Sequence, residues 1–449
     1  MEGTIKAIQG QVVEIEFSDG IMPKMHDTVA VVDHFEGTSG LESSLLLEVH
    51  GYLEHGRVQA VALGSTSGLK RNVKVTKVPE SESPVSSLDL RGNIIDGVGN
   101  FILRRTPSSD SKNLSRFVFQ GSGRAPKVVK SPLSNEVMPT RIKAIDLLAP
   151  IAKGSMTGIL GGAGVGKTEL MRQILQNFLS EEVNENRVVV FAGVGERIRE
   201  AHELYYNLDQ QFIDKSVFVF GQMDKSAGER FRTAHTALSI AEDYRDHHYH
   251  VLLFMDNLFR FVQAGAELST MFARMPSVLG YQPTLESELG NLLDRICSYE
   301  GETGCITSIQ CVYMPADDLT DPAVNEIYRH LDTVIVLDRE LTKETPRFYP
   351  AIDPLRSQSD AKQQEFKTQA DSVRQILRRK NSLCTKSKYG LTDSLEDDFL
   401  NKAENLRLYF KQSASPQLIN RNEINALIKS ADEARIRLSD ADVQQITQK

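Results

Sequence analysis

The residues from Gly161 to Thr168 form a glycine-rich loop with the spacing G-x-x-x-x-G-K-T. The loop reads Gly161-Gly162-Ala163-Gly164-Val165-Gly166-Lys167-Thr168. Because the apolar pair Ile159-Leu160 precedes it and a helix-like stretch follows, the spacing predicts a strand-to-helix turn. Backbone N–H groups in such a turn converge on one place, where the helix N-terminus adds positive charge. The loop therefore predicts a polyphosphate site, and the flanking elements disfavour a chance match in an unrelated loop.

Two side chains of the loop and one strand-ending carboxylate predict a magnesium–nucleotide site. Lys167 is expected to reach the β- and γ-phosphates, and the Thr168 hydroxyl is expected to bind Mg²⁺. Such sites also need an acidic residue at the end of a hydrophobic strand, and Asp256 closes the run Val251–Met255. An Asp at this position can also be a helix cap, but the phosphate loop favours the metal role. The expected ligands are Mg²⁺ with ATP or ADP.

A second strand ends in a carboxylate and a guanidinium. The run Val188–Ala192 leads into Gly193-Val194-Gly195-Glu196-Arg197. The carboxyl ends of parallel strands meet at one sheet edge, so Glu196 is expected to hold the attacking water and Arg197 the γ-phosphate oxygens. A surface salt bridge is the alternative for this pair. Arg260 follows the Asp256 strand by about one helical turn and is expected over the phosphates.

Three regions are predicted to position these residues. Residues 1–76 contain short alternating runs separated by Gly, Asp and Pro, which predict a small β-barrel or sandwich. Residues 77–355 alternate apolar strands with amphipathic helices, the pattern of a parallel sheet in a phosphate-loop domain. Residues 356–449 are polar and helix-prone, and are entered through Ser357–Gln369. The strands expected in the second region are Thr157–Leu160, Arg187–Ala192, Ser216–Phe220, His250–Met255, Ile306–Val312 and Thr333–Leu337.

Composition narrows the class of protein. With 449 residues and a net charge of −8, the chain predicts several domains and argues against nucleic acid as a main partner. No apolar run reaches the ~18 residues of a membrane span, and the start lacks a basic then apolar segment, so a cytosolic protein is expected. The cysteines lack C-x-x-C pairing and are expected to be reduced thiols: Cys297, Cys305, Cys311 and Cys384. The run His247–His250 lacks ligand spacing and predicts a helix-to-strand turn.

Eight segments in order resemble the catalytic β subunit of the rotary F-type ATP synthase. They are 143–150, 161–168, 191–197, 221–223, 256–261, 276–285, 316–323 and 349–355. The resemblance runs from about Gly3 to Leu355. The segment 316–323 is more similar to the β subunit than to the non-catalytic α subunit, a flagellar or secretion ATPase, or a Rho-type helicase. The resemblance implies an N-terminal β-barrel, a central RecA-like nucleotide domain and a C-terminal helical domain.

The resemblance also implies roles and partners. Lys167 and Thr168 match the phosphate and magnesium ligands, Glu196 the catalytic carboxylate, and Arg197 and Arg260 the γ-phosphate guanidiniums. Glu200 and Asp256 match outer-shell magnesium carboxylates, and Tyr349 matches the aromatic that stacks on adenine. The implied assembly is an alternating hexamer in which α-type subunits supply an arginine finger, around a central shaft subunit. It is expected at the cytoplasmic face of a membrane as a peripheral component.

The sequence departs from the family pattern in its last part. Met223–Gly228 replaces an acidic, double-proline turn, and no Phe, Tyr or Trp follows Phe410, although the family encloses adenine with a downstream aromatic pair. The acidic segment Asp393–Asp398 fits a shaft-contacting lever or a solvated helix start. Three functions stay open: a catalytic subunit of a rotary ATP synthase, an ATPase subunit of an F-like motor not coupled to proton-driven synthesis, and a non-catalytic nucleotide-binding assembly subunit. Retention of Glu196 argues against the third.

Overall fold

A computed structural model gives the fold of most of the chain. It describes residues 1–17, 22–32, 45–78, 90–104, 136–180, 186–296, 304–315, 318–344, 348–361, 365–388, 392, 394–412 and 416–447. Within it the chain forms two compact units. The first comprises Met1–Pro132, Glu182–Tyr313 and Asp318–His330, and the second comprises Leu133–Glu181, Met314–Asp317 and Leu331–Lys449.

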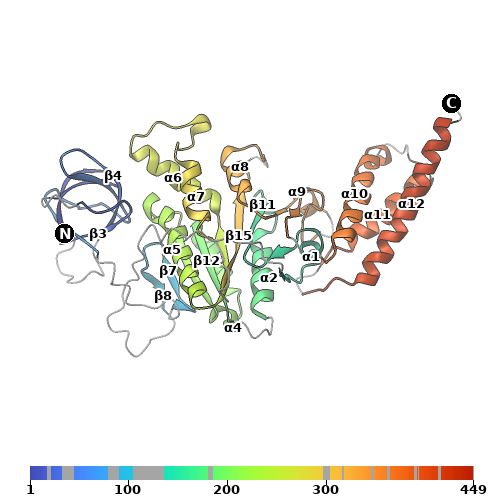
Figure 1. Cartoon of the computed structure of the whole chain (residues 1–449), viewed down its shortest axis with the longest axis horizontal. Coiled ribbons are helices and arrows are strands. Elements are labelled where there is room, and N and C mark those ends of the chain that lie inside the picture. The colour runs from blue at the N-terminus through green and yellow to red at the C-terminus, as the bar shows by residue number, and fades with distance from the viewer. Residues whose placement is uncertain are drawn as a thin grey trace. The chain divides into compact units, whose positions relative to one another are not determined.

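The first unit begins with a closed six-stranded barrel, drawn in blue in Figure 1. Its strands are β1 (Glu2–Gln9), β2 (Val12–Phe17), β3 (Thr28–Val31), β4 (Leu46–Tyr52), β5 (Arg57–Ala62) and β6 (Lys74–Lys77). They close in the order β1-β2-β5-β4-β3-β6, and every pair is antiparallel. Alternate residues such as Ile15, Val29 and Val58 are fully buried inside, so the period-two pattern forms the barrel core. Of the two predicted architectures, a barrel or a sandwich, the structure shows the barrel.

The rest of the first unit is a sheet of mainly parallel strands with helices. The strands are β7 (Ile94–Asp96), β8 (Phe101–Leu103), β12 (Arg187–Glu196), β13 (Ser216–Gln222), β14 (His250–Asp256) and β15 (Cys305–Tyr313). Their order is β15-β14-β12-β13-β7-β8, parallel except for the β7–β8 pair. The helical segments are α3 (Ile198–Tyr206), α4 (Gln210–Ile213), α5 (Ala227–Asp246), α6 (Leu258–Met271), η4 (Val278–Gly280), α7 (Leu285–Leu293) and α8 (Pro322–Arg329).

Helix α5 joins the barrel to this sheet. It packs on β12, β13 and β14, and it also contacts β5 of the barrel. A Cβ added at Gly228 would meet Val61 Cγ1 at 2.6 Å, so glycine permits this close approach. Arg232 of α5 pairs with Glu48 of β4, and the two side chains are 5% and 6% exposed. Apolar contact and a buried ion pair therefore fix the barrel on α5.

The second unit contains the remaining elements. Its strands are β9 (Val137–Met138), β10 (Ile151–Ala152), β11 (Met156–Gly161), β16 (Thr333–Val336) and β17 (Gln358–Ser359), and its short helices are α1 (Lys143–Leu148) and α9 (Arg339–Thr342). β11 and β16 are parallel, and β17 adds antiparallel to β16. The segment Ser357–Gln369, expected as a polar entrance to the helical region, thus contributes a short strand before its helix begins.

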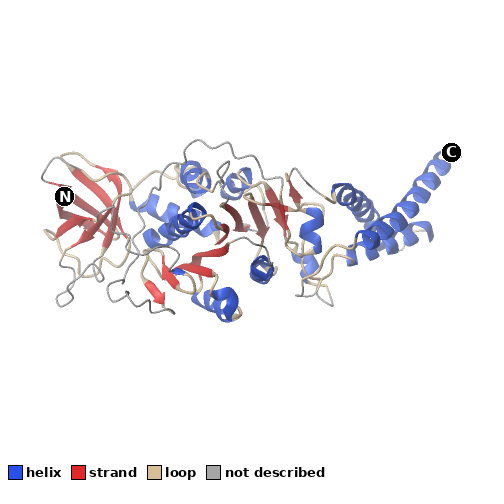
Figure 2. Cartoon of the chain, turned by 60° about the horizontal axis from the view of Figure 1, so that its bottom comes forward, coloured by secondary structure: helices blue, strands red, loops and turns tan. Residues whose placement is uncertain are grey.

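Helix α2 (Lys167–Ser180) follows β11, and three helices close the chain: α10 (Lys367–Lys388), α11 (Ser394–Leu408) and α12 (Arg421–Thr447). These last three contact one another. Figure 2 distinguishes the all-strand barrel from this all-helix end. The predicted fold class, a β-barrel, an α/β nucleotide domain and a helical end, is confirmed.

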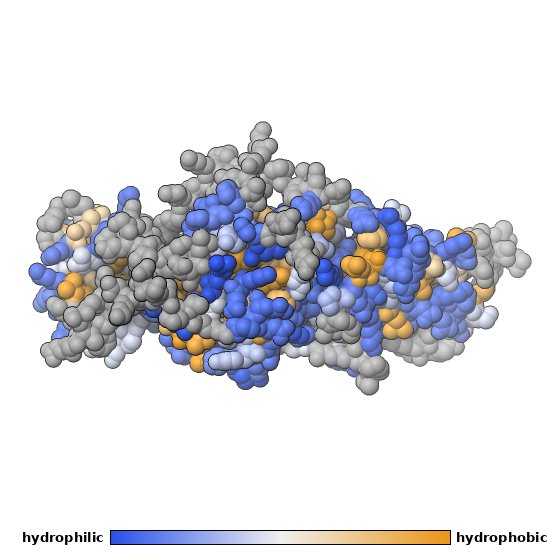
Figure 3. Space-filling view, turned by 90° about the horizontal axis from the view of Figure 1, so that it is seen from below, coloured by the Kyte–Doolittle hydropathy of each residue, from blue (hydrophilic) through white to orange (hydrophobic). Residues whose placement is uncertain are grey.

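Among the residues that are coloured by hydropathy in Figure 3, most on this face are hydrophilic, and the hydrophobic ones form small separate patches. Among the residues that the structure describes, no helix is both long enough and apolar enough to cross a membrane. Cys305 and Cys311 are buried and Cys384 is half-buried, all as free thiols, whereas Cys297 lies outside the described residues. Residues 247–249 form the predicted turn between α5 and β14, and His250 is the first residue of β14.

Candidate active site

The glycine-rich loop forms the predicted strand–turn–helix in the second unit. β11 ends at Gly161 and α2 begins at Lys167, which lies next to Gly166 in the loop. Gly164 and Gly166 have φ values of 76° and 96°, a backbone region in which side chains with a Cβ are strained. Lys167 Nζ donates to the Gly161 carbonyl oxygen at 2.9 Å, which holds the ammonium over the loop. Thr168 is exposed in the first turn of α2.

Tyr349 lies against the helix that this loop begins. Its hydroxyl donates to Gln173 Oε1 of α2 at 2.9 Å, and burial raises the pKa of Tyr349. Its carbonyl oxygen accepts a hydrogen bond of 2.7 Å from the backbone N–H of Gln412, just beyond α11. Within the second unit, the structure thus brings the predicted adenine-contacting ring to α2. Gln173 and Gln412 are supports that no sequence motif pointed to.

Three predicted carboxylates come together in the first unit. β12 and β14 are parallel, with Gly193 opposite Asp256, so both strands end at one sheet edge. β12 continues to Glu196, and Glu200 follows in the first turn of α3. Burial, a hydrogen bond with Glu200 and the charge of Asp256 raise the pKa of Glu196 to about 9. The same hydrogen bond lowers the pKa of Glu200. Because the cluster is partly buried and its carboxylates repel one another, Glu196 tends to stay protonated when no cation is bound.

Both predicted arginines flank this cluster. Arg197 precedes α3, and its Nη1 lies 4.0 Å from Glu200 Oε1 while its side chain is 66% exposed. Arg260 stands in the first turn of α6, and its Nη1 donates to Gln263 Oε1 at 2.7 Å. A Cβ on Gly195 would lie 3.0 Å from Arg260 Cβ, so the strand end passes directly against this arginine. The part played by Gly195 was visible in the sequence only as a permissive turn residue.

The carboxylate cluster fits a hard divalent cation. Mg²⁺ prefers oxygen ligands and is usually bound through one or two carboxylates together with substrate phosphates. Glu196, Glu200 and Asp256 supply such oxygens, and the mutual repulsion of these carboxylates, which together with burial raises the pKa of Glu196, would be relieved by a cation. The loop residues Lys167 and Thr168 belong to the second unit, and the carboxylates and arginines belong to the first.

Two further segments that carried the family resemblance meet in the first unit. The Tyr281 hydroxyl donates a hydrogen bond to Asp321 Oδ2 at 2.8 Å. Asp321 also caps α8, because its Oδ1 accepts from the N–H groups of Ala323 and Val324. The aspartate thus positions both the α8 start and the tyrosine. Ala316 and Asp317 of the same motif lie outside the described residues.

Comparison with known proteins finds one matching family, through two of its domains, and a similar protein. Residues 141–359 match the nucleotide-binding domain of the ATP synthase alpha/beta family, and residues 5–78 match the beta-barrel domain of the same family. The chain is also 42% identical over 362 residues to a protein of Bradyrhizobium sp. (strain BTAi1) called "ATP synthase subunit beta 2". That alignment covers 80% of this chain and 72% of the relative.

Proposed function

The chain belongs to the ATP synthase alpha/beta family as a protein similar to its β subunits, and from this membership we propose that it is a catalytic β-type subunit of a rotary F-type ATPase. The proposed reaction interconverts ATP and water with ADP and phosphate, coupled to rotation and to ion movement across a membrane. The observation that carries the catalytic part of the proposal is the cluster of Glu196, Glu200 and Asp256 at one sheet edge beside Arg197 and Arg260.

Each residue has a distinct proposed role in binding nucleotide or in its hydrolysis. Lys167 and the loop N–H groups bind the phosphates. Thr168, Glu200 and Asp256 hold Mg²⁺ directly or through water, and the ion when bound neutralises charge on the phosphate oxygens. Tyr349 stacks on the adenine ring.

Glu196 orients the attacking water and accepts its proton in the proposed hydrolysis. The water oxygen forms a bond to the γ-phosphorus, and the bond from that phosphorus to the bridging oxygen breaks, so that ADP leaves with the electron pair. Arg197 and Arg260 stabilise the negative charge on the γ-phosphate oxygens. For Glu196 to act as a base, its pKa, raised by burial and its carboxylate neighbours, must fall once positive charge enters the site.

The proposed assembly implies that one chain is not sufficient for full activity. In the proposed alternating hexamer, α-type subunits supply an arginine finger and a central shaft subunit couples rotation to the site. In a related class of phosphate-loop enzymes the finger is worth ~10³ to 10⁵ in rate. The isolated chain is therefore expected to bind nucleotide but to hydrolyse it slowly, and the complex is proposed to associate peripherally with a membrane at its cytoplasmic face.

A second candidate is the ATPase subunit of an F-like motor not coupled to proton-driven synthesis. It is favoured by one observation: the last part of the chain departs from the family pattern, since no Phe, Tyr or Trp follows Phe410. Purifying the native complex and identifying its subunits separates the two candidates. An α-type partner together with a membrane ring supports the synthase, and an α-type partner without such a ring supports the motor.

The catalytic proposal is tested with Glu196→Gln in the assembled complex. The amide keeps the shape of the side chain but cannot accept the proton, so hydrolysis should nearly vanish while magnesium-ATP still binds. A matched control is Glu203→Gln, which changes an exposed carboxylate of α3 that pairs with Arg199 at 2.8 Å. Unchanged turnover in the Glu196 variant would refute the assignment. Lys167→Ala should instead weaken binding of a fluorescent ATP analogue.

A further inference from the structure

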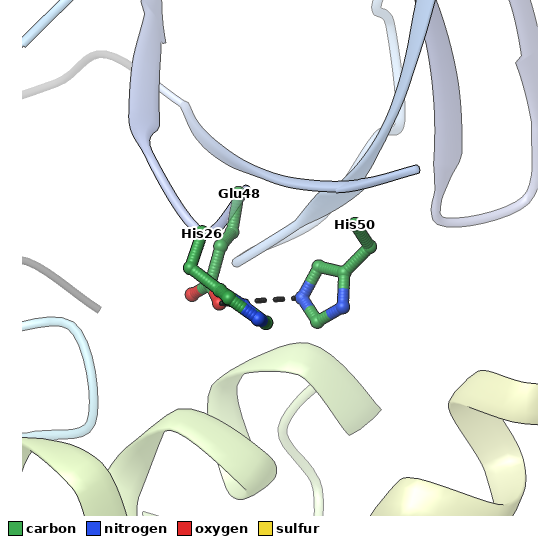
Figure 4. A group of neighbouring side chains, drawn as sticks. All are labelled: His26, Glu48 and His50. Atoms are coloured by element: carbon green, nitrogen blue, oxygen red, sulfur yellow. Dashed lines mark hydrogen bonds and ion pairs between the residues drawn. The ribbon is translucent and has the colours of Figure 1, made fainter. Parts of the chain in front are cut away.

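Two histidines and a glutamate converge on the outside of the barrel, next to α5 (Figure 4). Glu48 and His50 stand two residues apart on β4, so they share one face of the strand. Val49 between them is fully buried in the barrel core, which turns Glu48 and His50 away from that core. The third member, His26, precedes β3. The cluster takes no part in the proposed ATPase chemistry.

The backbone at His26 is held in an unfavourable conformation that presents this ring to Glu48. His26 has a φ of 65°, in the region that residues with a Cβ rarely adopt. Its N–H donates to the Val49 carbonyl at 2.7 Å, and the Val49 N–H donates back to the Asp27 carbonyl at 3.0 Å. These two bonds tie the segment before β3 to the middle of β4. Such strain at a polar cluster is typical of a functional site.

Both histidine nitrogens lie from one glutamate oxygen at about the spacing of neighbouring tetrahedral metal ligands. His26 Nδ1 lies 3.1 Å from Glu48 Oε1, and His50 Nε2 lies 3.3 Å from the same oxygen. All three ligand atoms lie within 4.8 Å of one another. Zinc binds nitrogen and carboxylate oxygen at about 2.0–2.2 Å, which places neighbouring tetrahedral ligands about 3.3 Å apart. Small movements of the two rings would therefore admit an ion without moving the backbone.

The surroundings orient the three ligands. Arg232 of α5 pairs with Glu48 through Oε2, the carboxylate oxygen that the histidines do not contact. This ion pair holds the carboxylate in place and leaves Oε1 facing the two imidazoles. His50 stacks on Phe272 with ring centroids 5.8 Å apart, which fixes the plane of its ring. Outer contacts of this kind commonly orient metal ligands.

We propose that His26 Nδ1, Glu48 Oε1 and His50 Nε2 bind a divalent transition-metal ion of the zinc class. Two imidazoles and a carboxylate are a ligand set that zinc uses when a fourth position stays open to water. Solvent can reach that position, because the His26 side chain is 37% exposed whereas those of His50 and Glu48 are 14% and 6% exposed. The ion would fasten the segment before β3 to β4, at the place where the barrel meets α5.

This site differs in chemistry from the proposed nucleotide site. Imidazole nitrogen suits zinc, cobalt and nickel, whereas Mg²⁺ takes oxygen ligands. Excess Mg²⁺ should therefore not displace the ion from the barrel. The competing account is a metal-free cluster in which both histidines only share hydrogen bonds with Glu48.

The test is titration of the full, untagged and metal-stripped chain with Co²⁺, without nucleotide and with excess Mg²⁺. We expect one equivalent per chain to give the visible absorption of four-coordinate cobalt, and Zn²⁺ to abolish it by displacement. His26→Asn and His50→Gln should each weaken binding by more than the ~10- to 100-fold that loss of an outer contact causes. Because these two side chains are partly exposed, the variants should still fold. Binding in the wild type should also raise the melting temperature.

Matched controls come from other histidines of the chain. His55→Gln changes an exposed residue of the same barrel, and the double variant His247→Gln/His248→Gln changes the turn before β14. Both should bind Co²⁺ like the wild type. No absorption and no rise in melting temperature in the wild type would overturn the proposal and leave the hydrogen-bonded account. Equal affinity in the His50 variant, or loss of binding in the turn variant, would overturn it as well.

Discussion

Gly195 lies against the aliphatic part of Arg260, so that a Cβ at position 195 would come within 3.0 Å of Arg260 Cβ and 3.3 Å of its Cγ. Gly195 also has a φ of 63°, and the next residue is Glu196. One glycine therefore sets the distance between the end of β12, which carries the proposed base, and the first turn of α6, which carries a proposed phosphate ligand. This contact makes the glycine a positioning residue for both.

Gly195→Ala is accordingly expected to lower hydrolysis in the assembled complex about 10- to 100-fold, because displacement of catalytic groups by a fraction of an ångström has effects of that order. Nucleotide binding through Lys167 should change much less. The control is Gly10→Ala, at a barrel turn with a φ of 61° and nothing within 4 Å of the added Cβ. Both variants carry the same backbone strain, of ~1 kcal/mol. Equal turnover in the two variants would refute the positioning role.

The raised pKa of Glu196 predicts how the stability of the nucleotide-free chain depends on pH. Burial is the main cause of the shift, from 4.5 to about 9. Between these two values the folded chain keeps a proton that the unfolded chain has lost, so the stability contribution is complete below pH 4.5 and is lost as pH rises through 9. Glu196→Gln should therefore melt at a higher temperature than the wild type, by a difference that grows across this range.

Thermal unfolding followed by circular dichroism at several pH values measures this difference. The control is again Glu203→Gln, an exposed neighbour on α3. It should follow the wild type at every pH. A Glu196→Gln variant whose melting temperature differs from that of the wild type by a constant amount would show that the carboxyl is ionised in the fold.

Much of the fold was predictable because the relevant signals are local. The strands β2, β5 and β12–β15 have long β-branched or alternating runs. The glycine-rich loop indicates the strand before it and the helix after it. β1 and β6 carry weaker local signals, since β6 has only four residues and β1 contains mixed polar positions. Both depend on long-range pairing, of Gly3 with Val75 for example, which closes the barrel. The local spacing of apolar residues carries no information about such a contact.

In the candidate site, too, some features could be predicted from local sequence and others could not. Glu196 and Asp256 were predictable as neighbours, because they end strands that lie side by side in a parallel sheet. The shift in the pKa of Glu196 was not predictable, since it arises from burial and from Glu200 and Asp256 together. The His26–Glu48–His50 cluster gave only one sequence signal, the two-residue spacing on β4. His26, which is 22 residues before Glu48 in the sequence, joins the cluster only when the barrel folds.

Tyr349 is expected to bind adenine through its ring and not through its hydroxyl, which already donates to Gln173. Tyr349→Ala should weaken binding of a fluorescent ATP analogue by ~1 to 3 kcal/mol, the value of stacking a base on an aromatic ring. Tyr349→Phe keeps the ring and should bind nearly as the wild type does. Equal losses in both variants would place the effect on the hydroxyl and its partner on α2.

The same measurement tests base selectivity. No aromatic residue follows Phe410, so a second stacking face from that part of the chain is missing. We expect GTP to compete well with ATP in the wild type, since one ring stacks on either purine. Discrimination against GTP as strong as in an ordinary β subunit would mean that other side chains complete the adenine pocket.

The acidic segment before and within α11 is the candidate lever. Asp397 accepts a hydrogen bond from the Thr392 hydroxyl at 2.6 Å, and Asp398 pairs with Lys402 at 2.8 Å. Glu396 is 7% exposed, and Asp393 lies outside the described residues. The local partners suit carboxylates at a helix N-terminus, where each charge is worth about 0.3–1 kcal/mol. A lever would in addition pass force to the shaft subunit.

Changing Asp393, Glu396, Asp397 and Asp398 together to Ala separates these two roles. Nucleotide binding and the fold should be nearly intact, because the partners described for Asp397 and Asp398, Thr392 and Lys402, lie in the same segment. Stimulation of ATPase by the shaft subunit should fall, since the proposed contact is removed. Lys402→Ala is the matched control: it breaks the same ion pair but keeps all four carboxylates, so stimulation should persist. Full stimulation in the quadruple variant would show that the segment is only a helix start and that any coupling depends on other residues.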